Sequence, residues 1–364
     1  MNFETLVKGS IKHKASDIHI LENSQPFLRI NGSLVRVEGK ETTRQEIEQI
    51  VAEVVPPRMS HLLETNRGVD FSYQFRNMER FRGVAFYEQE RLGLALRCIP
   101  MEIPTIEELE MPPVLKSVAR IHRGLVLLTG ITGCGKTTTL AAMIHHLNKL
   151  EARRVITIED PIEYVYAPAK CIISQREVGD DVPDFATGLR QALRMDPDVI
   201  LIGEMRDLET IRVSIKAAET GHLVLSTLHT TGAVHTIQRV VGHYPDQEHE
   251  LVREQLSLNL KASITQRLVK RADGSGRIAV QEIMIVNDVI AKLIRENRIS
   301  DIFPIIRSRE AGMQTFDQAL ADLVRAETIT FDEGKKYCED FYAYRRFIRG
   351  VTASSDKGAI LSAG

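Results

Sequence analysis

The segment LLTGITGCGKTTTL (127–140) constrains the fold of this chain more than any other stretch. It begins in an apolar run typical of a buried strand, and its residues 130–137 fit the pattern G-x-x-x-x-G-K-[ST] before a helix-like stretch. Glycines in such a loop let backbone N–H groups turn toward phosphate oxygens, and the dipole of the following helix adds positive potential. The segment therefore predicts a nucleoside triphosphate site between a strand and a helix.

The residues of this loop have separate expected tasks. Lys136 should reach the β- and γ-phosphates, and the Thr137 hydroxyl should hold Mg²⁺. Cys134 places a thiol at a helix N-terminus, which we interpret as a small filler and not as a redox switch. The expected ATP-binding residues are Gly130, Ile131, Thr132, Gly133, Cys134, Gly135, Lys136, Thr137 and Thr138.

From about residue 114 onward, short apolar runs alternate with helix-length segments. The predicted strands are GLVLLTG (124–130), RVITIED (154–160), DVILIGE (198–204) and HLVLSTLHT (222–230). This alternation predicts an α/β domain whose parallel sheet is covered on both faces. Residues 245–349 are expected to be mainly helical, apart from RIAVQEIMI (277–285).

The first hundred residues have a different pattern and predict a small mixed domain. Asn31-Gly32 between apolar segments predicts a hairpin, and TRQEIEQIVAEVV (43–55) has the spacing of a helix stopped by Pro56. The other expected strands are SDIHI (16–20), PFLRI (26–30), VDFSYQF (69–75), RFRGVAFYEQ (80–89) and GLALRCI (93–99). The predicted parts are domain 1–100, an acidic, proline-bearing linker 101–113, domain 114–350 and a disordered tail 351–364.

Composition excludes several classes of protein. A net charge of −2 argues against nucleic acid or an anionic membrane as the main partner. The apolar runs are too short for a transmembrane helix, and the N-terminus lacks the apolar core of a signal peptide. The four cysteines are single and far apart, which excludes a zinc ribbon or a disulfide framework. We expect a cytoplasmic chain that docks on a membrane complex without inserting.

A phosphate loop needs acidic partners at the ends of other strands. DVILIGE supplies Glu204, with Gly203 where such strands commonly carry an aspartate. After a different strand, Glu159 and Glu163 flank Pro161. This second cluster alone could be a solvated, helix-capping turn, but a missing aspartate favours a further carboxylate near the phosphates. One glutamate would orient the metal through water and the other would align the attacking water.

Two histidines flank the last predicted strand, His222 and His229. Since they are seven positions apart, an odd number, an unbroken strand would direct them to opposite faces, which argues against a zinc pair. His229 is placed to sense phosphate at the strand end. A hydrogen-bonded structural histidine is an equally good interpretation of the sequence.

Four stretches in order carry a family resemblance: GITGCGKT, ITIEDPIEYV, ALRMDPDVILIGEMRD and TGHLVLSTLHT. Together they closely resemble the Walker A, Asp box, Walker B and His box of the secretion ATPases, the motors of type II secretion and type IV pili. Within that superfamily the chain resembles the pilus retraction motors of the PilT/PilU type. The resemblance extends from ASDIHI (15–20) to GMQTFDQAL (312–320).

Several features favour the retraction branch. The chain lacks the longer N-terminal region and the four-cysteine zinc element usual in assembly and secretion motors. VIAKLIRENR (289–298) is similar to a C-terminal motif of retraction motors, although Ala291 and Lys292 replace its usual Arg and Asn. SLNLKA (257–262) is closer to PilU and GEMRDLETIR (203–212) to PilT, so the subtype stays open.

The resemblance implies an N-terminal PAS-like α+β domain joined by a linker to a RecA-like P-loop ATPase domain with a helical C-terminal part. It makes Glu163 the general base and Glu204 the Walker B carboxylate, while His222 and His229 sense the nucleotide. It also makes Arg82 and Arg97 the cations that reach the γ-phosphate. The alternative for these arginines is that they simply face solvent.

The resemblance also implies a homohexamer that hydrolyses ATP with Mg²⁺ and drives pilus retraction, the process behind twitching motility. Its expected partners are an inner-membrane platform protein and a paralogous retraction ATPase, with the ring peripheral at the inner face of the cytoplasmic membrane. One alternative is a pilus assembly or type II secretion ATPase. Another is a regulatory P-loop protein that hydrolyses ATP poorly. A RecA-like nucleic-acid motor is disfavoured by the net charge of −2.

Overall fold

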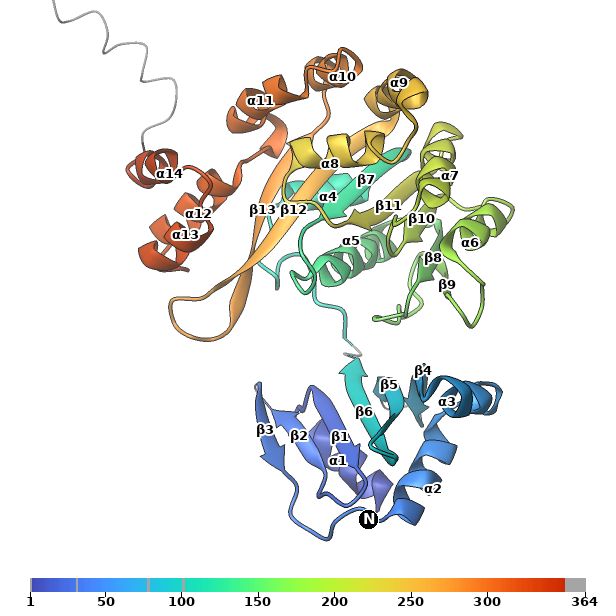
Figure 1. The fold of residues 1–364 in the computed structure, drawn as a ribbon. Coiled ribbons are helices and arrows are strands. Elements are labelled where there is room, and N and C mark those ends of the chain that lie inside the picture. The colour runs from blue at the N-terminus through green and yellow to red at the C-terminus, as the bar shows by residue number, and fades with distance from the viewer. Residues whose placement is uncertain (1, 31, 77–78, 100–101, 351–364) are drawn as a thin grey trace, which may run out of the picture. The chain divides into compact units, whose positions relative to one another are not determined.

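The computed structural model describes residues 2–30, 32–76, 79–99 and 102–350. The chain divides into two compact units, drawn in Figure 1. The N-terminal unit contains the residues up to Glu102 together with Glu163–Val165, and the C-terminal unit contains Ile103–Ile162 and the chain from Tyr166 onward. The predicted disordered tail 351–364 lies outside the described residues. Within those residues, no helix is both long and apolar enough to cross a membrane.

The N-terminal unit is built on an antiparallel sheet with the strand order β3-β2-β1-β6-β5-β4. Its strands are β1 (Asp17–Leu21), β2 (Phe27–Ile30), β3 (Ser33–Arg36), β4 (Gly68–Phe75), β5 (Glu79–Glu88) and β6 (Arg91–Ile99). Its helices are α1 (Phe3–Lys12), α2 (Arg44–Val54), the short η1 (Pro57–Met59) and α3 (Ser60–Asn66). Apolar residues of helices and strands form one shared core.

Local sequence explains two features of this unit. Helix α2 begins at Thr43, whose side chain accepts from the Glu46 N–H while the Glu46 carboxylate accepts from the Thr43 N–H, a complete capping box. The hairpin between β5 and β6 has a two-residue loop in which Gln89 and Glu90 both have positive φ, the conformation of a type I′ turn. This turn fixes which residues of β5 and β6 face each other.

The C-terminal unit contains a larger sheet with the order β13-β12-β7-β11-β10-β8-β9. Its strands are β7 (Gly124–Thr129), β8 (Arg154–Glu159), β9 (Ile172–Glu177), β10 (Val199–Ile202), β11 (Leu223–Leu228), β12 (Leu260–Lys270) and β13 (Arg277–Ile285). Neighbouring strands from β12 to β9 are parallel, and β13 pairs antiparallel with β12.

Helices of this unit pack against the sheet and against the β12–β13 hairpin (Figure 1). They are α4 (Val114–Ala119), α5 (Lys136–Leu150), α6 (Phe185–Ala192), α7 (Leu208–Glu219), α8 (Ala233–Val241), η2 (Asp246–Glu248), α9 (His249–Asn259), α10 (Asp288–Arg295), η3 (Ile299–Ile302), α11 (Phe303–Arg307), η4 (Glu310–Gly312), α12 (Phe316–Arg325), α13 (Phe331–Tyr337) and α14 (Phe341–Ile348). Leu125 and Leu127 of β7 face a core shared with α6, α7 and α9. A separate cluster joins β12 and β13 to α12 and α14.

The structure differs from the prediction for the C-terminal part in two ways. Residues 245–349 are mainly helical, but they contain a second strand besides 277–285, namely β12, which pairs with β7. The sheet is also not wholly parallel, because β13 runs antiparallel at its edge. The sequence pattern did not predict β12 as a strand because Thr265 and Gln266 interrupt its apolar run. Both side chains are buried and form hydrogen bonds inside the unit.

Candidate nucleotide site

The carboxyl ends of four neighbouring parallel strands meet at one edge of the C-terminal sheet. Strand β7 leads into the glycine-rich loop, and β11 lies between it and β10. His229 follows β11, Glu204 follows β10 after Gly203, and Glu159 ends β8. Ligands of open α/β sheets bind at this edge. The loop and these three predicted side chains therefore share one edge of the same unit.

Glycine is required at the first position of the loop. Gly130 has φ +138°, and a Cβ there would lie 2.4 Å from the Gln266 carbonyl oxygen and 2.7 Å from the Cys134 sulfur. Gly133 and Gly135 also have positive φ, at +76° and +86°. The glycines thus give the loop a backbone path that other residues rarely adopt, in the way the sequence predicts.

Helix α5 begins at Lys136, directly after the loop. The Lys136 ammonium donates hydrogen bonds to the carbonyl oxygens of Gly130 at 2.8 Å and Ile131 at 3.1 Å, so its side chain folds back over the loop. Ile131 is 66% exposed, and Thr137 is partly buried in the first turn. A phosphate that binds in the loop would thus compete with these two carbonyl oxygens for the hydrogen bonds that the Lys136 ammonium donates.

Cys134 is buried within the loop, with 3% of its surface exposed. Burial raises the pKa of the Cys134 thiol, against the opposing effect of the nearby Lys136 charge. The thiol therefore stays protonated and packs against Gly130, which agrees with its interpretation as a filler.

Glu204 lies at the centre of a charged cluster. Its Oε1 is 3.1 Å from His229 Nε2, and its Oε2 accepts a hydrogen bond of 2.7 Å from Arg206 Nε. The Glu204 side chain is 15% exposed, whereas those of His229 and Arg206 are 44% and 62% exposed. The carboxylate is thus held in place, and the imidazole and guanidinium groups beside it remain within reach of solvent.

Glu159 is held differently, at the buried end of β8. Its Oε1 accepts hydrogen bonds from the Thr157 hydroxyl at 2.6 Å and from Gln175 Nε2 at 3.1 Å. Only 5% of Glu159 is exposed. Gln175 comes from β9, a strand that the sequence pattern missed. Glu159 is therefore a fixed acceptor at the edge of the sheet and not part of a solvated turn.

Glu163 follows the same strand but belongs to the other unit. It is exposed and groups with Val165 in the N-terminal unit. Its assignment as general base remains a prediction that comes from the resemblance.

His222 lies at the opposite edge of the sheet from the phosphate loop of its own chain. It precedes β11, whereas the phosphate loop and His229 lie past the opposite ends of the paired strands β7 and β11. Its Nδ1 contacts the Ala217 carbonyl at 2.9 Å and the Thr220 hydroxyl at 3.2 Å, beyond the end of α7. A six-residue strand separates the two edges by about 20 Å. Within one chain His222 is therefore a hydrogen-bonded residue of the far edge, and its role in sensing the nucleotide remains a prediction that comes from the resemblance.

Arg82 and Arg97 are neighbours in the N-terminal unit. They are direct cross-strand partners on β5 and β6, so both side chains project from the same face of that sheet. Arg82 is 3.7 Å from Asp70, and Arg97 Nε donates to Asp17 at 2.8 Å. The arginine side chains are nevertheless 44% and 72% exposed. Their predicted reach to the γ-phosphate remains a proposal.

The most important residue that the sequence pattern missed is Gln266. This buried side chain on β12 donates to the Cys134 carbonyl at 2.7 Å and accepts from the Thr139 hydroxyl at 2.8 Å. It therefore contacts both the loop and the helix that follows. A glutamine inside a strand taken for part of a helical region gave no signal of this position.

The described residues contain no group of three or more His, Cys, Asp or Glu side chains that could hold a metal ion. An oxygen-rich partner set of Thr137 and Glu204 still suits Mg²⁺, which typically takes few protein ligands and completes its shell with water and phosphate oxygens.

Comparison with known proteins covers nearly the whole chain. Residues 101–335 match the family of type II/IV secretion system proteins. The type IV pilus retraction ATPase PilT of Pseudomonas aeruginosa is 42% identical over 337 residues, covering 92% of this chain and 98% of that protein. The type IV pilus ATPase PilU of the same organism is 38% identical, covering 100% of this chain and 96% of PilU.

A solved structure agrees with these relatives. The crystal structure of the pilus retraction motor PilT with bound ADP has a TM-score of 0.90 and 39% identity, covering 95% of this chain and 99% of that one. The likeness therefore includes the N-terminal sheet as well as the nucleotide-binding unit. The chain belongs to the type II/IV secretion system protein family, and within it to the ATPases of the PilT/PilU type.

Proposed function

We propose that this chain is the subunit of a homohexameric, ATP-hydrolysing motor that powers retraction of a type IV pilus. The observation that carries the proposal is the likeness to the retraction motor PilT across both units, combined with an intact phosphate loop, Lys136 and Glu204. An assembly or secretion motor would share the nucleotide site, but the match to PilT covers nearly all of both proteins.

The nucleotide would bind at the edge of the C-terminal sheet. Lys136 would exchange its bonds to the Gly130 and Ile131 carbonyls for phosphate oxygens, and the loop N–H groups would surround the phosphates. Thr137 and Glu204 would hold Mg²⁺, directly and through water. An ion held by these residues would supply positive charge that stabilises phosphoryl transfer.

Hydrolysis would then require carboxylates and cations with separate tasks. Glu163 would accept a proton from the attacking water, and His229 would report the γ-phosphate to Glu204, which it contacts at 3.1 Å. Arg82 and Arg97 would stabilise the charge on the transferring phosphoryl group. Since these arginines belong to the N-terminal unit, catalysis would depend on how that unit docks in the ring.

Force would be delivered by the ring as a whole. Each chain carries one phosphate loop, so coordinated work requires several copies. The hexamer would act at the inner face of the cytoplasmic membrane, transmitting domain rotations to an inner-membrane platform protein so that pilins leave the fibre. A paralogous retraction ATPase is a further expected partner.

The decisive experiment is deletion of the gene, with surface pili counted by electron microscopy and twitching motility measured on agar. If the motor retracts pili, the deletion strain should carry excess pili and lose motility. The wild-type chain and Glu250→Ala, a control at an exposed position of α9, should restore the normal phenotype, whereas Glu204→Ala should not. Loss of pili would instead identify an assembly motor. Unchanged pili and motility would favour a secretion or regulatory role and overturn the proposal.

A further inference from the structure

Gln266 forms one wall of the phosphate loop although it lies far from that loop in sequence. It is 1% exposed, and its Nε2 donates to the Cys134 carbonyl at 2.7 Å. Its main-chain carbonyl oxygen lies so close to Gly130 that a Cβ added to that glycine would be 2.4 Å away. A Cβ added to Gly135 would be 3.0 Å from the Gln266 Nε2. One residue of β12 thus contacts three positions of the loop.

The orientation of the Gln266 amide is fixed by two donors. Its Oε1 accepts from the Thr139 hydroxyl at 2.8 Å and from Gln281 Nε2 at 2.7 Å. With that oxygen doubly occupied, only the NH₂ group can point to the loop, where it meets the Cys134 carbonyl. The amide therefore joins α5, the phosphate loop and β13 in one buried network.

Gln281 extends this network across the hairpin. It is the direct cross-strand partner of Gln266 and is also 1% exposed. Its own Oε1 is buried and has no hydrogen-bond partner among the described residues. A buried acceptor of this kind costs free energy in the state it occupies, so a change in the network that gives it a donor would be favoured. Gln281 thus continues the buried network from β12 to β13.

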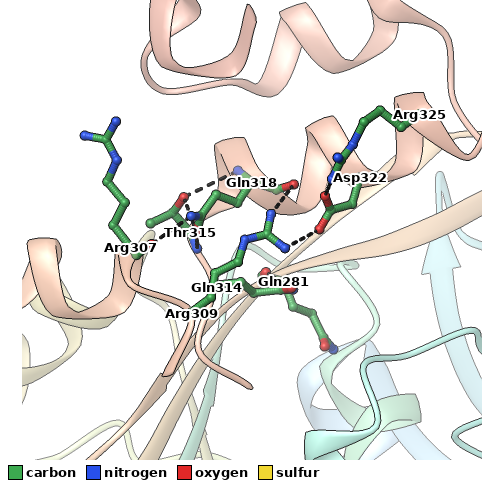
Figure 2. A network of polar contacts seen from close by, with 8 residues as sticks. All are labelled: Gln281, Arg307, Arg309, Gln314, Thr315, Gln318, Asp322 and Arg325. Carbon is green, nitrogen blue, oxygen red and sulfur yellow. Dashed lines mark hydrogen bonds and ion pairs between the residues drawn. The ribbon is translucent and has the colours of Figure 1, made fainter. Parts of the chain in front are cut away.

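Beyond Gln281 the contacts reach the segment that precedes α12. Gln314 Nε2 donates to the Gln281 carbonyl at 2.8 Å, and the main chain of Gln314 exchanges two hydrogen bonds with Ile283. Thr315 then begins α12 through a capping box with Gln318, whose Nε2 donates to the Arg307 carbonyl at 2.8 Å. Figure 2 shows this network around Gln314, Thr315 and Gln318.

A second set of contacts makes this region rigid. Arg309 donates to Asp322 on α12 at 2.7 Å and to the Gln318 carbonyl at 3.3 Å, and Asp322 also pairs with Arg325 (Figure 2). The start of α12 is therefore bound both to α11 and to the β13 main chain. A displacement of Gln281 would be transmitted to a firmly connected element and not to a loose loop.

We propose that Gln266 is a positioning residue of the phosphate loop and that, through Gln281, it couples nucleotide binding to residues 313–318 at the start of α12. When a phosphate draws Lys136 away from the Gly130 and Ile131 carbonyls, the loop adjusts and the Cys134 carbonyl moves with it. The Gln266 amide follows, and Gln281 with its unpartnered oxygen re-forms its contacts. This inference rests on nucleotide binding at the loop and is independent of which filament the motor serves.

The positioning role is tested by ADP affinity of the full-length chain. Gln266→Glu keeps the shape and the oxygen that Thr139 and Gln281 bond, and in its ionised form its second oxygen cannot donate to the Cys134 carbonyl. We expect about 10-fold weaker ADP binding by titration and a smaller rise of the unfolding temperature with ADP. Ser263→Ala is the matched control, since Ser263 is buried on the same strand and its hydroxyl has no partner among the described residues.

A structural defect alone would lower the unfolding temperature equally with and without ADP. If Gln266→Glu binds ADP as tightly as Ser263→Ala does, the positioning role is overturned. Lys136→Ala separates this outcome from an error in the site itself. If Lys136→Ala also binds ADP normally, the nucleotide-site assignment fails; if only Gln266→Glu does, the inference alone fails.

The coupling is tested by amide hydrogen exchange with and without ADP. In the wild-type chain, ADP should slow exchange in residues 313–318 several-fold. In Gln281→Leu, which removes one donor and one unpartnered acceptor, ADP should still bind but should leave exchange there unchanged. Equal ADP-dependent protection in the wild type and in Gln281→Leu would overturn the coupling, as would no protection in the wild type.

Discussion

Arg82 and Arg97 face each other directly across β5 and β6, so that two guanidinium groups project side by side from one sheet. Like charges at directly opposed positions destabilise a sheet. Asp70 and Asp17, on the flanking strands β4 and β1, offset this repulsion at 3.7 Å and 2.8 Å. The register that creates the pair is fixed by the two-residue turn at Gln89. A cationic pair maintained at this cost is suited to an anionic ligand.

Replacing either arginine tests this function. We expect Arg82→Ala and Arg97→Ala to lower the ATP turnover number of the assembled protein by roughly 10³, because each removes a cation that meets charge in the transition state. Turnover is measured at saturating ATP by phosphate release. Arg91→Ala, an exposed arginine on β6, serves as the control. Unchanged turnover in both variants would return Arg82 and Arg97 to the solvent-facing alternative.

Lys136→Ala should abolish ATP turnover. The ammonium that contacts the Gly130 and Ile131 carbonyls is lost, and with it the charge that would meet the β- and γ-phosphates. The measurement is phosphate release, with circular dichroism to confirm that the chain folds. A folded Lys136→Ala protein with normal turnover would show that the nucleotide is bound elsewhere.

Glu204→Ala should separate binding from hydrolysis. The variant loses the carboxylate that His229 and Arg206 hold at the end of β10, but keeps the whole phosphate loop. ATP affinity should therefore stay within a few-fold of wild type while turnover is lost. Calorimetric titration and phosphate release on the same preparation decide the outcome, with Glu250→Ala as control. Loss of binding would assign Glu204 a structural role.

Most strands at the centre of the nucleotide-binding unit were predictable because strands buried on both faces appear in the sequence as short, mainly apolar runs. That is why β7, β8, β10 and β11 agree with the sequence, as does the glycine-rich loop. Strand β12 was not predictable, since the partners of Gln266 and Thr265 lie on α5, β7 and β13, far away in the chain.

The distance of His222 from the phosphate loop of its own chain was hidden for a different reason. The odd separation of His222 and His229 correctly addresses which face of a strand each side chain takes. The separation does not show that the two histidines lie at opposite edges of the sheet, because that depends on how much of the segment between them forms β11. The register of Arg82 with Arg97 was also hidden, because Gln89-Glu90 lacks the Asn or Gly that announces a type I′ turn.

The buried carboxyl of Glu282 predicts how stability depends on pH. It accepts a 2.8 Å hydrogen bond from the Ala233 N–H at the start of α8, and burial raises its pKa from 4.5 to about 7. Its pKa is higher in the folded chain, so the folded state binds more protons, and stability from this group is lost as pH rises from 4.5 through 7.

Glu282→Gln should flatten this dependence. The amide oxygen can still accept from Ala233, but the side chain no longer ionises. Between pH 4.5 and 7 the free energy of unfolding should therefore fall less steeply than in wild type, measured by urea denaturation. Asp317, whose pKa burial also raises, is unchanged in both proteins, so the difference isolates Glu282. Parallel pH profiles would contradict the prediction.

The pairing of β7 with β12 has a consequence for biosynthesis. The hydroxyls of Thr129 and Thr265 meet at 2.8 Å although they are 136 positions apart in the chain. A ribosome therefore releases the glycine-rich loop long before the strand that walls it, and until then β7 has an open edge. The phosphate loop therefore gains its buried wall only after β12 has been synthesised and has paired with β7.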